Sequence, residues 1–177
     1  MQTQLPSSTA VTIEPQQDGS FLLSQDLFID LPRDRVFPFF EDPRNLFDIT
    51  PDWLHFVVRN KGLQTKVFEG AEFEYRIRWL GLPLPWRSRI VDYLPPLRFI
   101  DVQLAGPYRS WRHLHLFEER PGGTLMRDRI SYRLPAGAAG RLVHAIVVRR
   151  QLEDIFRYRA GAIEAWSRGE FRGKPRH

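Results

Sequence analysis

Much of the chain alternates between apolar and polar residues with a period of two, which is typical of β-strands that bury one face. The alternation is cleanest over residues 71–80, where Phe73, Tyr75, Ile77 and Trp79 share one face and charged residues occupy the other. Glycine and proline separate these segments, and the connections are too short for crossovers between parallel strands. The pattern predicts an antiparallel sheet of about seven strands, over residues 21–29, 55–59, 71–80, 86–94, 98–104, 108–119 and 124–134.

Helical patterns flank the predicted sheet. Two short helices are expected after the first strand, over residues 33–40 and from Pro43 toward Ile49, because Asp42-Pro43 ends the first and begins the second. Residues 138–168 predict one long amphipathic helix. Its apolar stripe is Leu142, Ile146, Leu152, Ile155 or Phe156, Ile163 and Trp166. That stripe has to be buried against a sheet that twists and curves, so the fold class is α+β, with an interior space between helix and sheet.

The composition supports a single folded unit. With 177 residues and 42% hydrophobic content, we expect one domain over residues 21–168, preceded by a flexible leader (1–20) and followed by a basic tail (169–177). The chain has no cysteine, which excludes disulfides and thiolate-ligated metals. The first residues lack a signal-peptide pattern, and no apolar run approaches the length of a bilayer span. We therefore expect a cytoplasmic protein without a membrane span.

The net charge of +5 and pI of about 10.0 raise the question of an acidic partner. The basic residues are nearly all arginine, and they are interleaved with Asp and Glu along the predicted strands. No nucleic-acid recognition motif accompanies them, so the pattern favours a solvated outer face. The expected partner is a small molecule and not a nucleic acid, and the expected assembly is a monomer or homodimer.

Three successive predicted strands place polar side chains on faces that also carry aromatic and aliphatic ones. These polar side chains are Asp101, Gln103, His113, His115, Asp128 and Tyr132. Their apolar companions are Phe99, Trp111, Phe117, Met126 and Ile130. A buried polar group left without a hydrogen bond costs about 1–3 kcal/mol, so these groups need partners.

Four interpretations of this polar group stay open from the residues alone. It can be a structural network, or the polar end of a pocket whose apolar wall includes Phe73, Tyr75, Trp79 and Trp86. A metal site would use His113 and His115 with a neighbouring carboxylate, but a His-x-His pair on a strand is a weak motif, so we predict no metal and no cofactor. Acid–base catalysis would use a histidine paired with an aspartate.

Arginines on the predicted long helix add a further possibility. Arg149, Arg150, Arg157 and Arg159 lie on several sides of that helix. One of them turned inward could meet an anionic ligand.

Specific strings of the sequence resemble the SRPBCC (START / pollen-allergen-like) superfamily, and its bacterial ligand-binding, cyclase/dehydrase-like branch most of all. The strings are 39–46 (FFEDPRNL), 49–54 (ITPDWL), the 86–92 strand before Pro95-Pro96, Phe99-x-Asp101-x-Gln103, Gly106-Pro107-Tyr108-x-x-Trp111-x-His113-x-His115-x-Phe117, Gly123-Thr124 and Asp128-x-Ile130-x-Tyr132. The resemblance as a whole runs from about residue 21 to residue 168. The resemblance implies a helix-grip fold, in which a curved sheet wraps around a long C-terminal helix.

The resemblance also implies a class of function, because the superfamily binds lipids, sterols, polyketides and hormones in its cavity and only some members are enzymes. We expect binding, with or without transport, of a small hydrophobic or amphipathic molecule such as a lipid or polyketide. The alternative is a polyketide aromatase/cyclase or dehydratase-like enzyme, with His113, His115 and Asp128 as candidate catalytic residues. The candidate ligand-binding residues are Tyr75, Trp79, Trp86, Phe99, Asp101, Gln103, Trp111, His113, His115, Asp128 and Tyr132.

Overall fold

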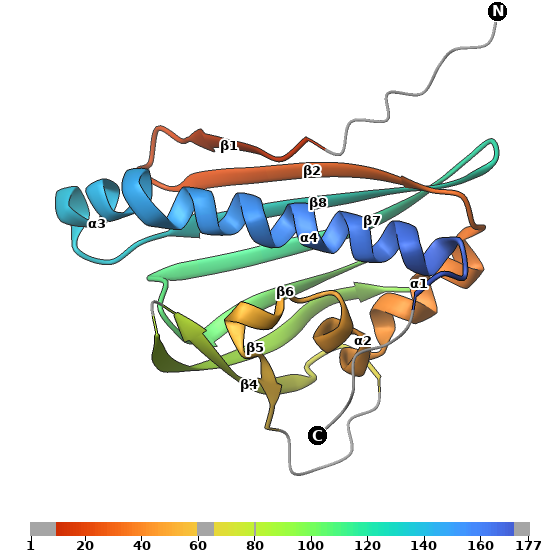
Figure 1. Ribbon diagram of the computed structural model, residues 1–177, viewed down its shortest axis with the longest axis horizontal. Helices are drawn as coiled ribbons and strands as arrows, with labels where there is room; N and C mark the ends of the chain where they lie inside the picture. The colour runs from red at the N-terminus through yellow and green to blue at the C-terminus, as the bar shows by residue number, and fades with distance from the viewer. Residues whose placement is uncertain (1–9, 60–65, 80, 172–177) are drawn as a thin grey trace, which may run out of the picture.

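The computed structural model describes residues 10–59, 66–79 and 81–171, and these form an eight-stranded antiparallel sheet with helices at its open side (Figure 1). The strands are β1 (Thr12–Pro15), β2 (Phe21–Ile29), β3 (Val57–Val58), β4 (Glu72–Trp79), β5 (Leu82–Leu94), β6 (Arg98–Ala105), β7 (Ser110–Arg120) and β8 (Gly123–Arg133). The helices are α1 (Arg33–Glu41), α2 (Pro43–Asp48), the 3-10 turn η1 (Asp52–Leu54), α3 (Gly137–Val143), the π-helical turn η2 (His144–Val148) and α4 (Arg149–Ser167).

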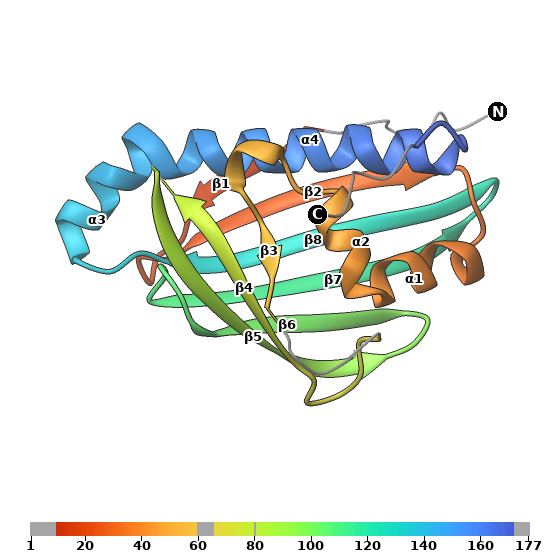
Figure 2. The same cartoon turned by 60° about the horizontal axis from the view of Figure 1, so that its bottom comes forward.

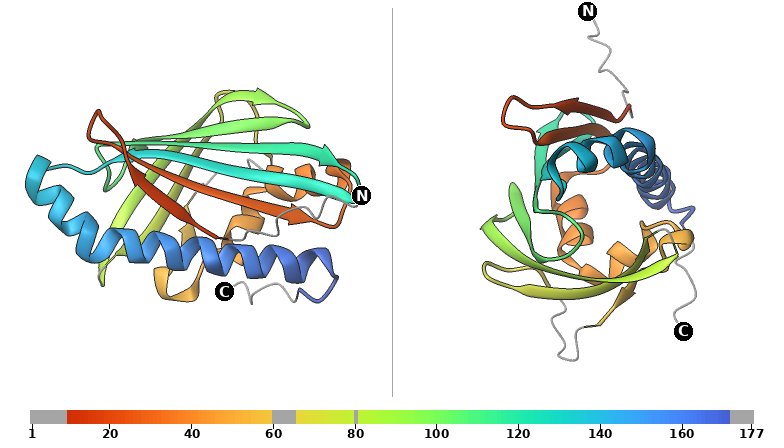
Figure 3. Two further views of the ribbon diagram at one scale, coloured as in Figure 1. Left: turned by 90° about the horizontal axis from the view of Figure 1, so that it is seen from above. Right: turned by 90° about the vertical axis from the view of Figure 1, so that its left-hand side faces the viewer.

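The strand order is β1-β2-β8-β7-β6-β5-β4-β3, so β4 to β8 follow one another as a meander, and β2 returns beside β8. The sheet is strongly curved, as the end-on view in Figure 3 shows, and α4 runs along its open side. Figure 2 shows α1 and α2 near one end of this arrangement. The predicted fold class, a helix-grip α+β fold, is confirmed.

Two of the three apolar clusters of the core include buried residues of α4. One cluster surrounds α1 and includes Ala160 and Ile163 from α4. The other lies toward the start of α4 and includes Val148, Leu152 and Phe156. Between these two clusters the concave face of the sheet carries polar side chains, and the candidate site lies there.

One expectation about the ends of the domain needs correction. Strand β1 lies inside the range assigned to a flexible leader, and it pairs with β2 from Thr12↔Ser24 to Pro15↔Phe21. It escaped sequence reasoning because a four-residue edge strand with a single buried side chain, Ile13, leaves almost no alternation to detect. The other part of the leader, 1–9, and most of the basic tail, 172–177, lie outside the described residues.

The long helix also departs from the predicted stripe at its beginning. Leu142 and Ile146 are 62% and 66% exposed, whereas His144 and Val148 are buried. Residues 144–148 form a π-helical turn, which holds more residues per turn than an α-helix and so rotates the buried face. From Leu152 onward the predicted stripe is correct, with Phe156 and Ile163 buried. No helix among the described residues has both the length and the apolar character to cross a bilayer.

Candidate functional site

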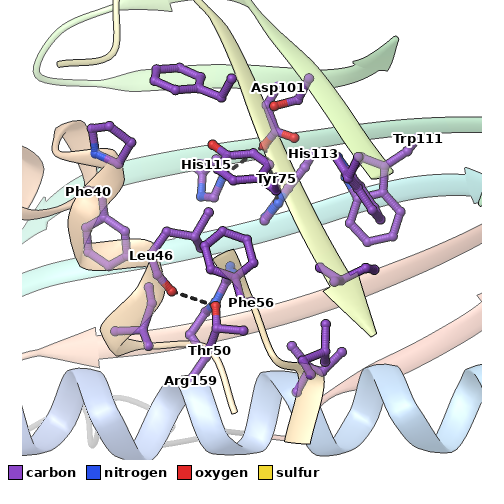
Figure 4. Close-up of a pocket in the computed structure, with 18 of the residues that line it drawn as sticks. Phe40, Leu46, Thr50, Phe56, Tyr75, Asp101, Trp111, His113, His115 and Arg159 are labelled. Carbon is purple, nitrogen blue, oxygen red and sulfur yellow. Dashed lines mark hydrogen bonds and ion pairs between the residues drawn. The ribbon is translucent and has the colours of Figure 1, made fainter. Parts of the chain in front are cut away.

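A cavity of about 200 Å³ lies between the concave face of the sheet, the α1–η1 region and α4. Strands β4 to β7 provide one wall, with Tyr75, Trp86, Phe99 and Trp111 among its aromatic side chains. Most of the lining is aromatic or aliphatic. The polar side chains that reach the cavity include Ser88, Asp101, His113, His115 and Arg159, and Figure 4 shows several of them converging from opposite sides.

The wall opposite the sheet comes from short helical segments. Leu46, Thr50, Leu54 and Phe56 all line the cavity. The Thr50 hydroxyl donates a hydrogen bond to the Leu46 carbonyl at 2.5 Å, which ties the end of α2 to the following turn. The sequence predicted the helix from Pro43 toward Ile49 but assigned none of these side chains to the site, because so short a helix shows no clear 3.6-residue period that identifies its inward face.

Asp101, His113, Asp128 and His115 form a closed group, called here the Asp–His ring, in which each histidine contacts both aspartates. The His113 Nε2–Asp128 Oδ1 distance is 2.8 Å, and the His113 Nδ1–Asp101 Oδ2 distance is 3.5 Å. For His115, Nε2 lies 3.3 Å from Asp101 Oδ2, and Nδ1 lies 3.0 Å from Asp128 Oδ1. The last contact is short but lacks hydrogen-bond geometry. The two imidazole centroids are 3.7 Å apart.

Strand register explains why the ring forms. Asp101 on β6 lies directly opposite His113 on β7, and Asp128 on β8 lies directly opposite His115. Directly opposed side chains on one face of an antiparallel sheet are close enough to interact, and the diagonal pairs are within reach of long side chains. Two direct pairs and two diagonal pairs therefore close the ring across three strands.

Burial and the four contacts shift the ring's pKa values in different directions. Burial would raise the pKa of both carboxyls, but the neighbouring histidines outweigh it and lower the pKa of Asp101 and of Asp128. Burial, together with repulsion from His115, lowers the pKa of His113. Burial also opposes the charge on His115, yet its contacts with both aspartates prevail and raise its pKa. The ring thus favours two carboxylates, a protonated His115 and a neutral His113.

Arg159 on α4 faces the ring across the cavity (Figure 4). The residue is only 8% exposed, and its guanidinium carbon lies 4.9 Å from the centroid of the Phe156 ring. Among the described residues, its Nε has no hydrogen-bond partner. Burial lowers its pKa, against the attraction of Asp128 and Asp101. Of the four arginines noted on this helix, Arg159 is the one turned inward, since Arg149, Arg150 and Arg157 are exposed.

The predicted ligand-binding residues separate into two groups. Tyr75, Trp86, Phe99, Asp101, Trp111, His113 and His115 line the cavity. Asp128 contacts both histidines but does not line the cavity. Gln103 turns to the loop before β7, where its side-chain amide donates to the Tyr108 carbonyl at 2.7 Å. Tyr132 is fully buried, with its hydroxyl 2.7 Å from His144 Nε2. The side chain of Trp79 lies outside the described residues.

A metal ion is the remaining chemical possibility for the ring. Asp101, His113 and His115 each offer a ligand atom, and these atoms lie within 4.8 Å of one another. Both nitrogens of each histidine already face carboxylate oxygens, however, and an ion would have to replace those contacts. The donor types would suit zinc or iron. The absence of a metal stays a prediction.

Comparison with known proteins agrees with the fold. No protein-family model matches the chain, and no curated protein matches it by sequence. Among solved structures, TTHA0849 from Thermus thermophilus superposes with a TM-score of 0.64 at 17% identity, covering 84% of this chain and 97% of that one. The protein Ara h 8.0201 has a TM-score of 0.60 at 12% identity, with 82% and 98% covered.

A third similar structure is the Zhui aromatase/cyclase from Streptomyces sp. R1128. It has a TM-score of 0.60 at 16% identity and covers 82% of this chain and 94% of that one. Identities this low establish the fold alone. At the level of fold, these neighbours agree with the sequence's resemblance to the SRPBCC superfamily and its cyclase/dehydrase-like branch.

Proposed function

We propose that the protein binds a small hydrophobic or amphipathic molecule in this cavity, and that binding, with or without transport, is its function in the cytoplasm. The observation that carries the proposal is a space of about 200 Å³ inside the domain, walled mainly by aromatic and aliphatic side chains. Protein interiors are otherwise packed nearly as densely as organic crystals. An apolar cavity of about 150 Å³ accommodates benzene, so this one suits a single substituted ring or a short acyl chain.

The Asp–His ring would orient the ligand within the cavity. An apolar body would lie against Tyr75, Trp86 and Phe99, while a polar group would reach Asp101, His113 and His115, which also line the cavity. Few, well-placed polar groups on an apolar wall are the usual composition of small-molecule sites.

Native and denaturing mass spectra of freshly purified protein test the proposal. The matched control is Ile155→Trp, which adds an indole from α4 at a half-buried position of the cavity wall. We expect wild type to carry a small-molecule adduct, or to acquire one from a mixture of small aromatic and acyl compounds, and to lose it on denaturation. The variant should carry much less. Equal loading of both proteins would contradict binding in this cavity.

A second candidate is an aromatase/cyclase or dehydratase-like enzyme, and one observation favours it. His113 and His115 lie together on the cavity wall, and because the pKa of His115 is raised and that of His113 lowered, the pair would offer a proton donor and a proton acceptor to the same space. The Zhui aromatase/cyclase has the same fold. His113→Ala separates the two candidates: an enzyme should keep binding and lose turnover of the bound molecule, whereas a carrier should show altered binding and no turnover in either form.

A further inference from the structure

Arg159 is a buried polar residue of the cavity wall whose hydrogen bonding within the protein is incomplete. The residue is buried, with only 8% of its surface exposed, and its Nε is without a hydrogen-bond partner in the part of the chain that the structure describes. No carboxylate among those residues forms an ion pair with its guanidinium, whose carbon lies 4.9 Å from the centroid of the Phe156 ring. A buried cation without hydrogen bonds is costly, so a partner from outside the protein would be favoured.

The ring does not serve as that partner. The histidines contact Asp101 through Oδ2 and Asp128 through Oδ1 at 2.8–3.5 Å, and neither carboxylate forms an ion pair with Arg159 among the described residues. The two carboxylates attract Arg159 only at a distance. The guanidinium is therefore a hydrogen-bond donor available to a molecule in the cavity.

We propose that the ligand is a small apolar acid whose carboxylate is bound by Arg159, with its apolar body against the aromatic wall of the sheet. A guanidinium binds a carboxylate through two parallel hydrogen bonds, and such charge-assisted pairs are the strong ones. Figure 4 shows the Arg159 side chain extending from α4 into the space between Thr50, Phe56 and the histidines, where the head of a ligand would lie. This inference rests on the proposed binding function and specifies the chemistry of its ligand.

Paired probes of equal shape and different charge test the inference by isothermal titration calorimetry. The probes are 3-phenylpropionate against 3-phenylpropionamide, and octanoate against octanamide. In wild type we expect each acid to bind roughly 10- to 100-fold more tightly than its amide. This ratio of affinities corresponds to the usual free energy of a hydrogen bond to a charged group. Arg159→Met keeps most of the apolar stem and removes the charge, so it should abolish the preference while leaving amide binding nearly unchanged.

Arg157→Met is the matched control, because Arg157 lies on the same helix with its side chain 71% exposed. It should retain the preference for acids. Equal binding of acid and amide by wild type, or a preference that survives in Arg159→Met, would overturn the acid proposal while leaving cavity binding intact. Failure of all four probes to bind wild type would overturn both. If Arg159→Met does not fold, the acid–amide comparison in wild type decides alone.

Discussion

Asp128→Asn tests whether the Asp–His ring holds the centre of the sheet together by charge. Asp128 is buried and its Oδ1 lies 2.8 Å from His113 Nε2 and 3.0 Å from His115 Nδ1. Asparagine keeps the shape and one acceptor oxygen but removes the negative charge. Removing one partner of a buried ion pair costs about 3–5 kcal/mol, because the other charge is left uncompensated. We expect a loss near the lower end, about 3 kcal/mol, since His115 can respond by releasing its proton.

Urea unfolding measures this loss. With a slope of about 2 kcal/mol per molar urea, a loss of about 3 kcal/mol lowers the midpoint by about 1.5 M. The control is Asp154→Asn, which breaks a solvent-exposed pair with Arg157 on α4 and should cost less than about 0.5 kcal/mol. NMR titration should also show a lower His115 pKa in Asp128→Asn. Equal midpoints for the two variants would refute the charged-ring description.

Three further outcomes are expected. Gly123→Ala should destabilise the protein by about 1–3 kcal/mol, measured by urea unfolding, because the added Cβ would lie 2.2 Å from the Ile29 carbonyl oxygen. In Gly161→Ala on α4 the added Cβ meets no atom within 4 Å, so this variant should be more stable by about 0.5–1 kcal/mol. The folded-state pKa of His115 is raised, so the contribution of its charge to stability is full below the unfolded pKa of about 6.5 and is lost as pH rises through the folded pKa. The difference in unfolding free energy between wild type and His115→Gln should therefore shrink as pH rises above about 6.5. A difference that grows with pH would contradict a raised His115 pKa. Treatment with EDTA should leave the melting temperature and probe binding unchanged, and a marked loss of either would indicate a metal in the ring.

The sequence predicted the faces of the strands correctly, because a strand's two-residue period determines which side chains share a face. Asp101, His113, His115 and Asp128 were therefore expected together. Their mutual contacts required the register, which pairs Asp101 with His113 and His115 with Asp128 and which depends on hairpin geometry that alternation does not reveal.

The sequence could not place the side chains that lie opposite the sheet. Four arginines on the last helix looked equivalent, and the π-helical turn at 144–148 shifts the helical phase, so periodicity could not single out Arg159. Gln103 and Tyr132 were predicted to line the cavity but do not, because a strand face extends farther than the space it encloses. The extra strand β1 was too short to show a period.

The most direct test of the central claim is an NMR titration that follows the tryptophan indole N–H signals while 3-phenylpropionate or octanoate is added. Trp86 and Trp111 line the cavity, whereas Trp166 stacks on Phe39 and is not part of the cavity wall. We predict that the signals of Trp86 and Trp111 shift and saturate together while the signal of Trp166 stays in place. Saturable shifts at Trp166 with Trp86 and Trp111 unchanged, or no saturable shift at any of the three, would contradict binding in this cavity.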